Sequence, residues 1–290
     1  MSKHTSAEKQ LVKDYYDLQG WKKDRGSIFT DAARFEDLRP VVNDYRIKCH
    51  LRVNQHLIKN GKFILDIASG PVQYPEYLTY SEGYQYRICG DISFTALQEA
   101  KKVVGEKGLF VQCDVTRLPF SDEALDGVVS LHTIYHVPEN EQKKALTELH
   151  RVLAPEKQGV VVYSFARYSI LLKILMLPFN IYKLARMVGG NLLRALKLKP
   201  ALPEAGATKI HGKLYFHPHS FRWFKEQIKP LMDYQVFPWR SVTVSFTRSS
   251  IRAKLGGKLF LDTLYRLEER FPSWFGKHGA YPMIVIKKSG

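Results

Sequence analysis

The chain has 290 residues, of which 45% are hydrophobic and 12% aromatic, and its formal net charge is +16. That composition excludes a disordered chain and is ample for a packed core, so a globular protein is expected. Residues 1–13 contain no apolar signal-peptide core. The three cysteines lack metal-ligand spacing and are expected to be reduced residues of a cytoplasmic protein; they are Cys49, Cys89 and Cys113.

The first sixty residues predict helices. Ser6 can cap a helix that runs to Leu18, and a longer helix is expected from about Asp37, with apolar residues at helical spacing as far as Leu57. We expect these helices to form a lid over the crevice described below. Tyr15 and Tyr16 either contact a ligand there or, as the plainer interpretation has it, are core aromatics of the lid.

The first predicted strand is the apolar run 63–67, which contains Asp66. Its β-branched residues and flanking glycines are typical of a buried parallel strand. Ser69, Gly70 and Pro71 then form a turn with little side-chain bulk, which allows backbone N–H groups to approach a ligand closely. An ordinary strand-to-helix loop is the alternative interpretation.

Further strands follow at regular intervals. Residues 86–93 and 109–116 are apolar runs that reach Asp91 and Asp114, and residues 124–137 and 159–165 supply a fourth and a fifth run. Residues 141–153 have a helical pattern between the last two. This alternation predicts an α/β fold, a doubly wound and mostly parallel sheet, with a ligand crevice at the carboxyl ends of its strands.

Residues 63–165 resemble the class I S-adenosylmethionine-dependent methyltransferases, in particular the methyltransferase-11-like branch with a DxPF turn before the fourth strand. Asp66, Ala68, Gly70 and Val72 occupy the positions of that family's DxGxGxG motif, so the central glycine alone is kept. LPFSDEALDGVVSLHTIYHV and LTELHRVLAPEKQG look like the family's later segments. The resemblance implies a Rossmann-like seven-stranded sheet with strand seven antiparallel between strands five and six.

The resemblance also implies S-adenosyl-L-methionine as cofactor and S-adenosyl-L-homocysteine as product. A carboxylate after the second strand can accept both ribose hydroxyls, which suits Asp91. By resemblance, Asp114 accepts the adenine amino group and Val115 offers backbone to the ring. Alternatively, Asp91 and Asp114 cap the following helices. A nicotinamide cofactor is disfavoured because the first turn lacks GxGxxG. The cofactor-binding residues expected are Asp66, Ala68, Ser69, Gly70, Asp91, Ile92, Asp114, Val115 and Ser130.

The segment after the fourth strand is where the family places its reactive methyl group. Methyl transfer to oxygen or nitrogen requires alignment and often removal of a proton, a task that suits histidine. His132 is the first candidate base, while His136 is a catalytic candidate that can equally be structural. Tyr135 lies between them and completes the candidate catalytic set. The absence of [DN]PPY at this strand end argues against methylation of adenine or cytosine amines.

Residues 167–199 hold seven lysines and arginines and no acid. On a helix most of these basic residues share one side, with an interruption expected at Pro178 and at Gly189 and Gly190. The uncharged stretch 174–182 is too short to span a bilayer. The segment either lies on an anionic membrane or packs as a lid with its basic face in water. Basic residues elsewhere are dispersed, so nucleic acid is not the favoured partner.

Towards the C-terminus, Ser220 is expected to cap an aromatic-rich helix. His211, His217 and His219 precede it without a carboxylate or cysteine nearby in sequence, so no metal site is predicted. They either line the acceptor pocket or decorate the loop. Residues 233–239 and 280–287 are predicted as strands six and seven, with a helix over 257–271.

These observations predict one domain in four parts: a helical lid (1–60), a cofactor-binding core (61–165), a basic amphipathic insertion with an acceptor-side cap (166–230), and closing strands and helix (231–290). The expected activity is methyl transfer to an oxygen or nitrogen of a small-molecule, lipid-linked or glycan-linked acceptor. The alternatives are a catalytically inactive binding protein of the same fold and an RNA methyltransferase. The expected location is the cytoplasm. The protein would be peripheral at the inner face of a membrane if residues 167–199 form a membrane contact and not a lid.

Overall fold

The computed structural model describes residues 3–23, 28–195 and 214–290. Within these residues the strands form one seven-stranded sheet in the order β3-β2-β1-β4-β5-β7-β6. The strands are β1 (Gly61–Ile67), β2 (Tyr84–Asp91), β3 (Gly108–Gln112), β4 (Leu125–Leu131), β5 (Leu153–Val162), β6 (Asp233–Arg240) and β7 (Tyr281–Lys287). β7 runs antiparallel to both β5 and β6, and the other pairings are parallel. The predicted fold class is confirmed, and so is the antiparallel position of strand seven between strands five and six.

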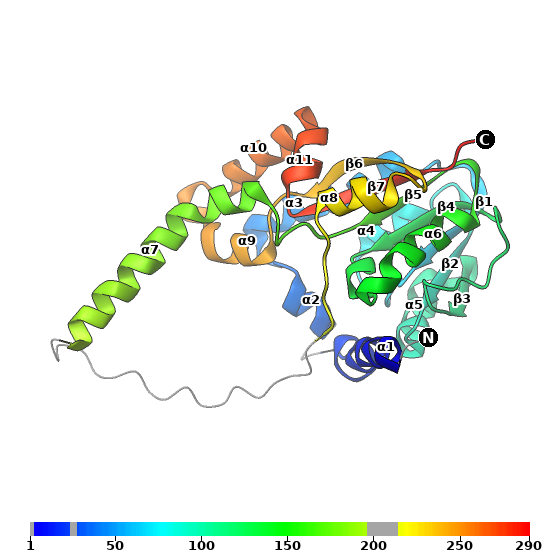
Figure 1. Cartoon of the computed structure of the whole chain (residues 1–290), viewed down its shortest axis with the longest axis horizontal. Coiled ribbons are helices and arrows are strands. Elements are labelled where there is room, and N and C mark those ends of the chain that lie inside the picture. Colours follow the sequence, from blue (N-terminus) through cyan, green and yellow to red (C-terminus); the bar gives the residue numbers. More distant parts are fainter. Residues whose placement is uncertain (1–2, 24–27, 196–213) are drawn as a thin grey trace.

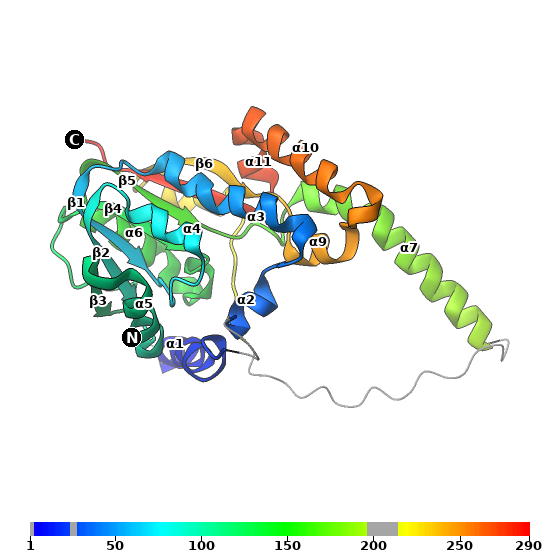
Figure 2. The same cartoon turned by 180° about the vertical axis from the view of Figure 1, so that it is seen from behind.

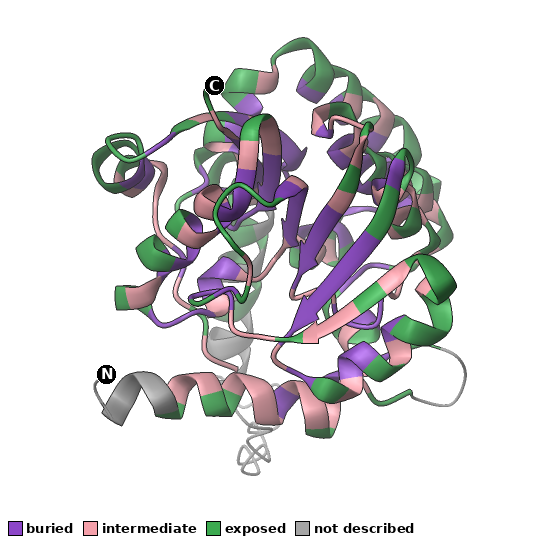
Figure 3. Ribbon diagram, turned by 90° about the vertical axis from the view of Figure 1, so that its right-hand side faces the viewer, coloured by how far each residue is buried: buried purple, intermediate pink, exposed green. Residues whose placement is uncertain are grey.

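The central strands are apolar on both faces because both faces are covered. Successive residues of a strand point to opposite sides, so Leu65 of β1 joins the cluster under α6 (Gln142–Val152), while Ile64 joins the cluster on the other face. Leu65 pairs in register with Ile88 of β2 and Val128 of β4. The burial colours of Figure 3 show the same continuous core along the central strands.

Helices cover the two faces separately (Figures 1 and 2). α6 and α8 (Phe221–Trp223) lie on one face. α3 (Pro40–Leu51), α4 (Pro75–Leu78) and α5 (Phe94–Val104) lie on the other. Two more N-terminal helices are α1 (Lys3–Tyr15) and α2 (Thr30–Phe35). Helices α9 (Val244–Ser250), α10 (Gly257–Arg270) and α11 (Pro272–His278) follow β6, and of these α10 alone was predicted.

Two predicted caps differ from the structure. α1 already includes residue 6, so Ser6 cannot be its N-cap. Ser220 does occupy the N-cap position of α8, but its side chain makes no capping hydrogen bond. A serine before an apolar run indicates a helix start only where the chain also turns there, and that depends on the surroundings.

α7 (Ile170–Ala195) is one continuous helix that projects away from the sheet (Figure 1). The interruption expected at Pro178 and at Gly189 and Gly190 is therefore wrong: a proline removes one hydrogen bond, and the neighbouring turns of a long helix still hold. Leu172 anchors the first turns in a core cluster with α9 and α10. Among the residues that the structure describes, no helix is long and apolar enough to cross a membrane.

The turn after β1 has an unusual backbone. Ala68, Gly70 and Val72 have φ angles of 54°, 54° and 53°, all in the left-handed region that favours glycine. Two of these residues carry side chains, and Val72 is β-branched and buried. Each non-glycine residue in this region is disfavoured by about 1–2 kcal/mol. The chain thus keeps the glycine conformation of the DxGxGxG turn at positions where the glycines are replaced.

We expect Ala68→Gly to raise the free energy of unfolding by about 0.5–1 kcal/mol, because the strain relieved at positive φ exceeds the entropy that glycine adds to the unfolded chain. Urea unfolding followed by circular dichroism measures this. The control is Ala100→Gly in α5, which has helical backbone and should lose about 1 kcal/mol or more. Equal destabilisation by both changes would contradict the strain at residue 68.

Candidate functional site

A small cavity lies at the carboxyl ends of the first three strands. Its volume is about 60 Å³. Five of the predicted cofactor residues line it together: Ala68, Asp91, Ile92, Asp114 and Val115. Parallel strands bring their carboxyl ends to one edge of the sheet, which is why residues this far apart in sequence meet.

Asp91 ends β2 and is 5% exposed. Its Oδ2 accepts a hydrogen bond from the backbone N–H of Gly70 at 3.0 Å, and its Oδ1 accepts one from Ser93 N–H at 2.8 Å. Burial raises the pKa of Asp91 to about 6, against the lowering effect of these two bonds. Asp91 therefore holds the turn after β1 in place, and each oxygen retains a lone pair for a ligand.

The other predicted residues of the turn and of β4 are placed differently. Asp66 forms a buried ion pair with Arg87 of β2, so its carboxylate joins two strands. Ser69 Oγ donates to the Gly70 carbonyl at 3.1 Å. Ser130 is fully buried on β4, and its Oγ has no hydrogen-bond partner among the described residues. Of these residues, Asp66 is the one whose charge is already compensated within the protein.

The N-terminal helix closes the small cavity. Lys9 and Val12 of α1 form part of its wall. Lys9 Nζ lies 2.7 Å from Asp114 Oδ2 and 2.9 Å from Thr116 Oγ1, and it also pairs with Glu141. Burial opposes ionisation of Asp114, but Lys9 holds its pKa below the usual range. Figure 3 shows this helix lying across the ends of the strands. The predicted adenine-binding carboxylate is thus occupied by a lysine of the lid.

The chain after α1 covers the strained turn. Trp21 stacks on Tyr16 with ring centroids 4.9 Å apart. Its indole lies against Gly70, where a Cβ atom would be 2.9 Å from the ring. The Ser93 hydroxyl also donates a hydrogen bond to the carboxylate of Asp17. The expected lid is present, and glycine at position 70 makes room for the tryptophan as well as for the backbone.

A second, larger cavity of about 1090 Å³ lies beside the first. The predicted catalytic residues His132, Tyr135 and His136 line it, as does Tyr16 of the lid. Its other aromatic residues are Phe35, Tyr74, Tyr77, Phe216, Trp239 and Tyr281. His136 lines both cavities and so stands at their boundary.

The two histidines are held in apolar surroundings. His132 has a φ of 57°, and its ring lies edge-on to Trp239 at 4.5 Å between centroids. Burial, with a contribution from Arg240, lowers the pKa of His132 to about 3. His136 Nδ1 lies 2.6 Å from the carbonyl oxygen of Tyr215, and burial lowers its pKa to about 4. Both imidazoles are therefore neutral at pH 7.

Charged residues also line the large cavity. Asp31 of α2 lies there, with Oδ2 3.3 Å from Gln73 Nε2. Glu36 pairs with Arg240 of β6, and the buried His50 lies 3.6 Å from Glu36. These carboxylates face an aromatic interior, where unpaired charges are strongly disfavoured.

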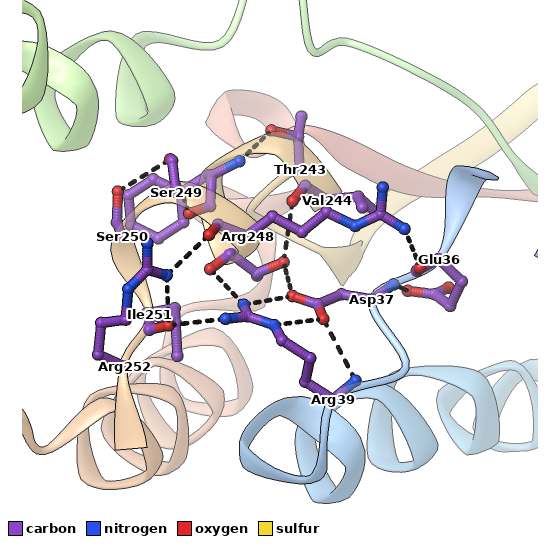
Figure 4. Close-up of polar contacts among 12 residues, drawn as sticks. Glu36, Asp37, Arg39, Thr243, Val244, Arg248, Ser249, Ser250, Ile251 and Arg252 are labelled. Atoms are coloured by element: carbon purple, nitrogen blue, oxygen red, sulfur yellow. Dashed lines mark hydrogen bonds and ion pairs between the residues drawn. The ribbon is translucent and has the colours of Figure 1, made fainter. Parts of the chain in front are cut away.

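A polar junction fixes this part of the cavity wall (Figure 4). Asp37 is 1% exposed and accepts hydrogen bonds from Thr247 Oγ1 at 2.7 Å and from Arg39 Nε at 2.8 Å. Arg248 Nη2 donates to the carbonyl oxygens of Ala33 and Glu36, each at 2.7 Å. The junction joins the end of α2 to α9, more than 200 residues away in sequence.

The loop before α8 needs a correction. The prediction that no carboxylate accompanies its histidines is wrong, because His217 Nε2 lies 3.4 Å from Glu139 Oε1. Glu139, His217 and His219 place one possible ligand atom each within 4.8 Å of one another. The loop also crosses the large cavity, since His217 N–H donates to the Tyr135 carbonyl at 2.8 Å. His211 and residues 196–199 of the basic segment lie outside the described residues.

Sequence reasoning missed three residues that enter the site: Lys9 and Asp31 of the lid, and Gln73 after the turn that follows β1. The spacing of Lys9 and Asp31 within their helices gives no signal that either faces a cavity. Gln73 directly follows the motif-like turn, and this position was the available signal. Arg240 directly follows the predicted strand 233–239 and ends β6. It was not predicted as a site residue because an arginine is more often exposed than buried.

Comparison with known proteins finds a family match for the core of the chain. Residues 65–161 match the family model described as a methyltransferase domain. The probable tRNA methyltransferase 9B of Mus musculus is 29% identical over 135 residues, which are 46% of this chain and 28% of that protein. The ubiquinone/menaquinone biosynthesis C-methyltransferase UbiE of Stenotrophomonas maltophilia is 26% identical over 216 residues, which are 65% of this chain and 83% of that protein. The chain thus spans less than a third of the first relative.

A solved structure of similar architecture is the complex of DhpI with SAH. Its TM-score is 0.54 at 13% sequence identity, and the alignment covers 99% of each chain. At this identity the likeness concerns the fold. The matched domain and the relatives support a class I S-adenosylmethionine-dependent methyltransferase, and the DhpI structure shares its fold.

Proposed function

We propose that the chain binds S-adenosylmethionine at the small cavity and methylates an acceptor held in the large one. The observation that carries this proposal is the meeting of the two cavities at His136. On one side stand the carboxylates Asp91 and Asp114, which suit ribose and adenine donors. On the other side stands an aromatic chamber large enough for an organic acceptor.

The residues that line the small cavity fit the cofactor, but the cavity has to enlarge to hold it. Asp91 and Asp114 supply acceptor oxygens, and the left-handed turn supplies backbone without long side chains. A cavity of about 60 Å³ holds little more than one or two water molecules. We therefore expect Lys9 and Val12 to move outward with α1 when the cofactor binds.

The cofactor supplies an electrophilic methyl group. The chain's own residues would orient the reactants: Asp91 the ribose, Asp114 the adenine amino group, and the aromatic wall the acceptor. Tyr135 is buried, and burial raises its pKa well above the usual range, so its hydroxyl stays protonated. Exclusion of water by these rings favours transfer to the acceptor over hydrolysis.

The lining of the large cavity supports a small-molecule, lipid-linked or glycan-linked acceptor methylated at oxygen or nitrogen. Aromatic rings offer apolar contact, while Arg34 and Arg248 add positive charge at the wall. The names of the relatives differ in substrate, one concerning quinone biosynthesis and another tRNA. RNA methylation therefore remains the alternative acceptor class, and it would give binding that weakens steeply with salt.

We expect Asp91→Ala to weaken the binding of S-adenosylhomocysteine by about 1.5–3 kcal/mol, the scale for loss of a charge-assisted hydrogen bond. Calorimetric titration of the two proteins measures this. The matched control is Asp122→Ala, which removes an exposed carboxylate far from the cavity and should leave the affinity unchanged. Unaltered affinity in Asp91→Ala would remove that residue from the site.

Turnover separates an enzyme from an inactive binding protein. We expect purified protein, given S-adenosylmethionine and a panel of phenolic, amine, lipid and glycan acceptors, to release S-adenosylhomocysteine with at least one of them. Mass spectrometry identifies the methylated product. Binding of S-adenosylhomocysteine without turnover on any small acceptor or RNA would favour the inactive alternative.

A second proposed property is attachment of α7 to an anionic membrane surface, supported by its exposed apolar residues. Ile174, Leu177 and Ile181 are 61%, 56% and 58% exposed, and Lys173 and Arg186 are exposed basic residues of the same helix. Such a helix can bury its apolar side at the interface while its basic residues contact acidic headgroups. The attachment would bring a lipid-linked acceptor to the protein.

We expect the protein to sediment with vesicles that contain phosphatidylglycerol, and Ile174→Ser with Ile181→Ser to reduce the bound fraction several-fold. Reversal of charge at Lys173 and Arg186 should have a similar effect at low salt. Leu109→Ser, on the edge strand β3 away from α7, is the matched control. Failure of the unaltered protein to sediment would end this proposal.

A further inference from the structure

We propose that Asp31 is the catalytic base of the large cavity, which takes the proton from the O–H or N–H group of the acceptor. The inference rests on the methyl transfer proposed above and names the residue that removes the proton. The roles proposed for Asp91 and Asp114 in cofactor binding are unchanged, since Asp31 belongs to the lid and lines the large cavity.

Asp31 is tied to the turn that would hold the cofactor. Its Oδ2 lies 3.3 Å from Gln73 Nε2, and Gln73 directly follows the strained residue Val72. Gln73 Oε1 is buried and has no hydrogen-bond partner among the described residues. No described residue donates a hydrogen bond to Oδ1 of Asp31, which leaves that oxygen free to take the proton of the molecule to be methylated. The carboxylate is thereby positioned from both the lid and the sheet.

The surroundings of Asp31 make it a stronger base than an exposed aspartate. Burial raises its pKa to about 6, the Gln73 hydrogen bond and Arg34 act to lower it, and Glu36 acts to raise it. The remaining titratable groups that face it are the hydroxyls of Tyr15, Tyr16, Tyr74 and Tyr135, and burial raises the pKa of each. At pH 7 Asp31 is ionised and the tyrosines are neutral.

Asp31 suits proton removal better than either histidine. General bases are most effective when their pKa lies near the working pH. His132 and His136, with pKa values lowered to about 3 and about 4, bind a proton weakly. The Nδ1 atom of His136 is also engaged by the Tyr215 carbonyl. The histidines remain shape-determining residues of the cavity in this account.

The step balances in atoms and charge. The Asp31 carboxylate accepts the proton and becomes a neutral carboxyl group. The electron pair left on the acceptor oxygen or nitrogen forms the bond to the methyl carbon, and the pair of the carbon–sulfur bond stays on sulfur. The negative charge of the carboxylate and the positive charge of the sulfonium are lost together, so the step leaves no additional charge in the aromatic cavity.

The first test is the pH dependence of turnover. With the acceptor found in the screen, we expect Asp31→Asn to lower kcat 10²–10³-fold, within the usual range for a general base, and to leave the affinity for S-adenosylhomocysteine within twofold. The rate of the unaltered protein should rise through pH about 6 to a plateau, and this limb should vanish in the variant. Asp31→Glu should restore part of the rate. Asp262→Asn on α10 is the matched control.

The second test needs neither cofactor nor acceptor. In full-length protein with ¹³C-labelled aspartate, the carboxyl signal that disappears in Asp31→Asn should titrate near pH 6, and Gln73→Leu should move it higher because the lowering hydrogen bond is lost. Titration near the ordinary value of about 3.9, or full activity of Asp31→Asn, would overturn the proposal. Failure of the unaltered protein to bind S-adenosylhomocysteine would instead defeat the proposed function.

Discussion

The left-handed turn after β1 is the constraint on which the site depends. Its backbone lets the N–H of Gly70 reach Asp91, and its last residue leads directly to Gln73, which contacts Asp31. One short segment therefore connects the carboxylate proposed for the cofactor with the carboxylate proposed for the acceptor. Strain at Ala68 and Val72 persists because the surrounding strands and the lid determine the conformation more strongly than local preference does.

Much of the fold follows from the sequence because the central strands are apolar on both faces. Strands of this kind are buried on both faces only in a sheet that helices cover on both sides. The spacing between successive apolar runs leaves room for one helix between each pair of strands. The meeting of Asp91 and Asp114 follows from the same topology, since Asp91 ends β2 and Asp114 lies two residues beyond the end of the neighbouring parallel strand β3. Strand order and the antiparallel β7 came from the family resemblance and not from periodicity.

The lid side of the site could not be predicted in this way. Asp31 lies on a six-residue helix whose position is set by hydrogen bonds to α9, from Arg248 to Ala33 and Glu36. Lys9 likewise enters the small cavity through contacts with residues more than 100 positions away. A helix as short as α2 carries little local signal, and contacts at such sequence separation as those of Lys9 cannot be predicted from sequence patterns. The opposite error was made for α7, where a proline and two glycines predicted an interruption that the helix does not have.

If α1 moves outward to admit the cofactor, as proposed above, the ion pairs of Lys9 with Asp114 and Glu141 make cofactor affinity depend on a two-state lid. If the closed state predominates, the measured dissociation constant is the intrinsic one divided by the fraction of open molecules. Added salt screens these pairs and enlarges the open fraction. Salt would then tighten apparent cofactor binding at first, opposite to its usual effect on polar ligands. The same equilibrium would let the surrounding ionic strength set the fraction of molecules that are open to the cofactor.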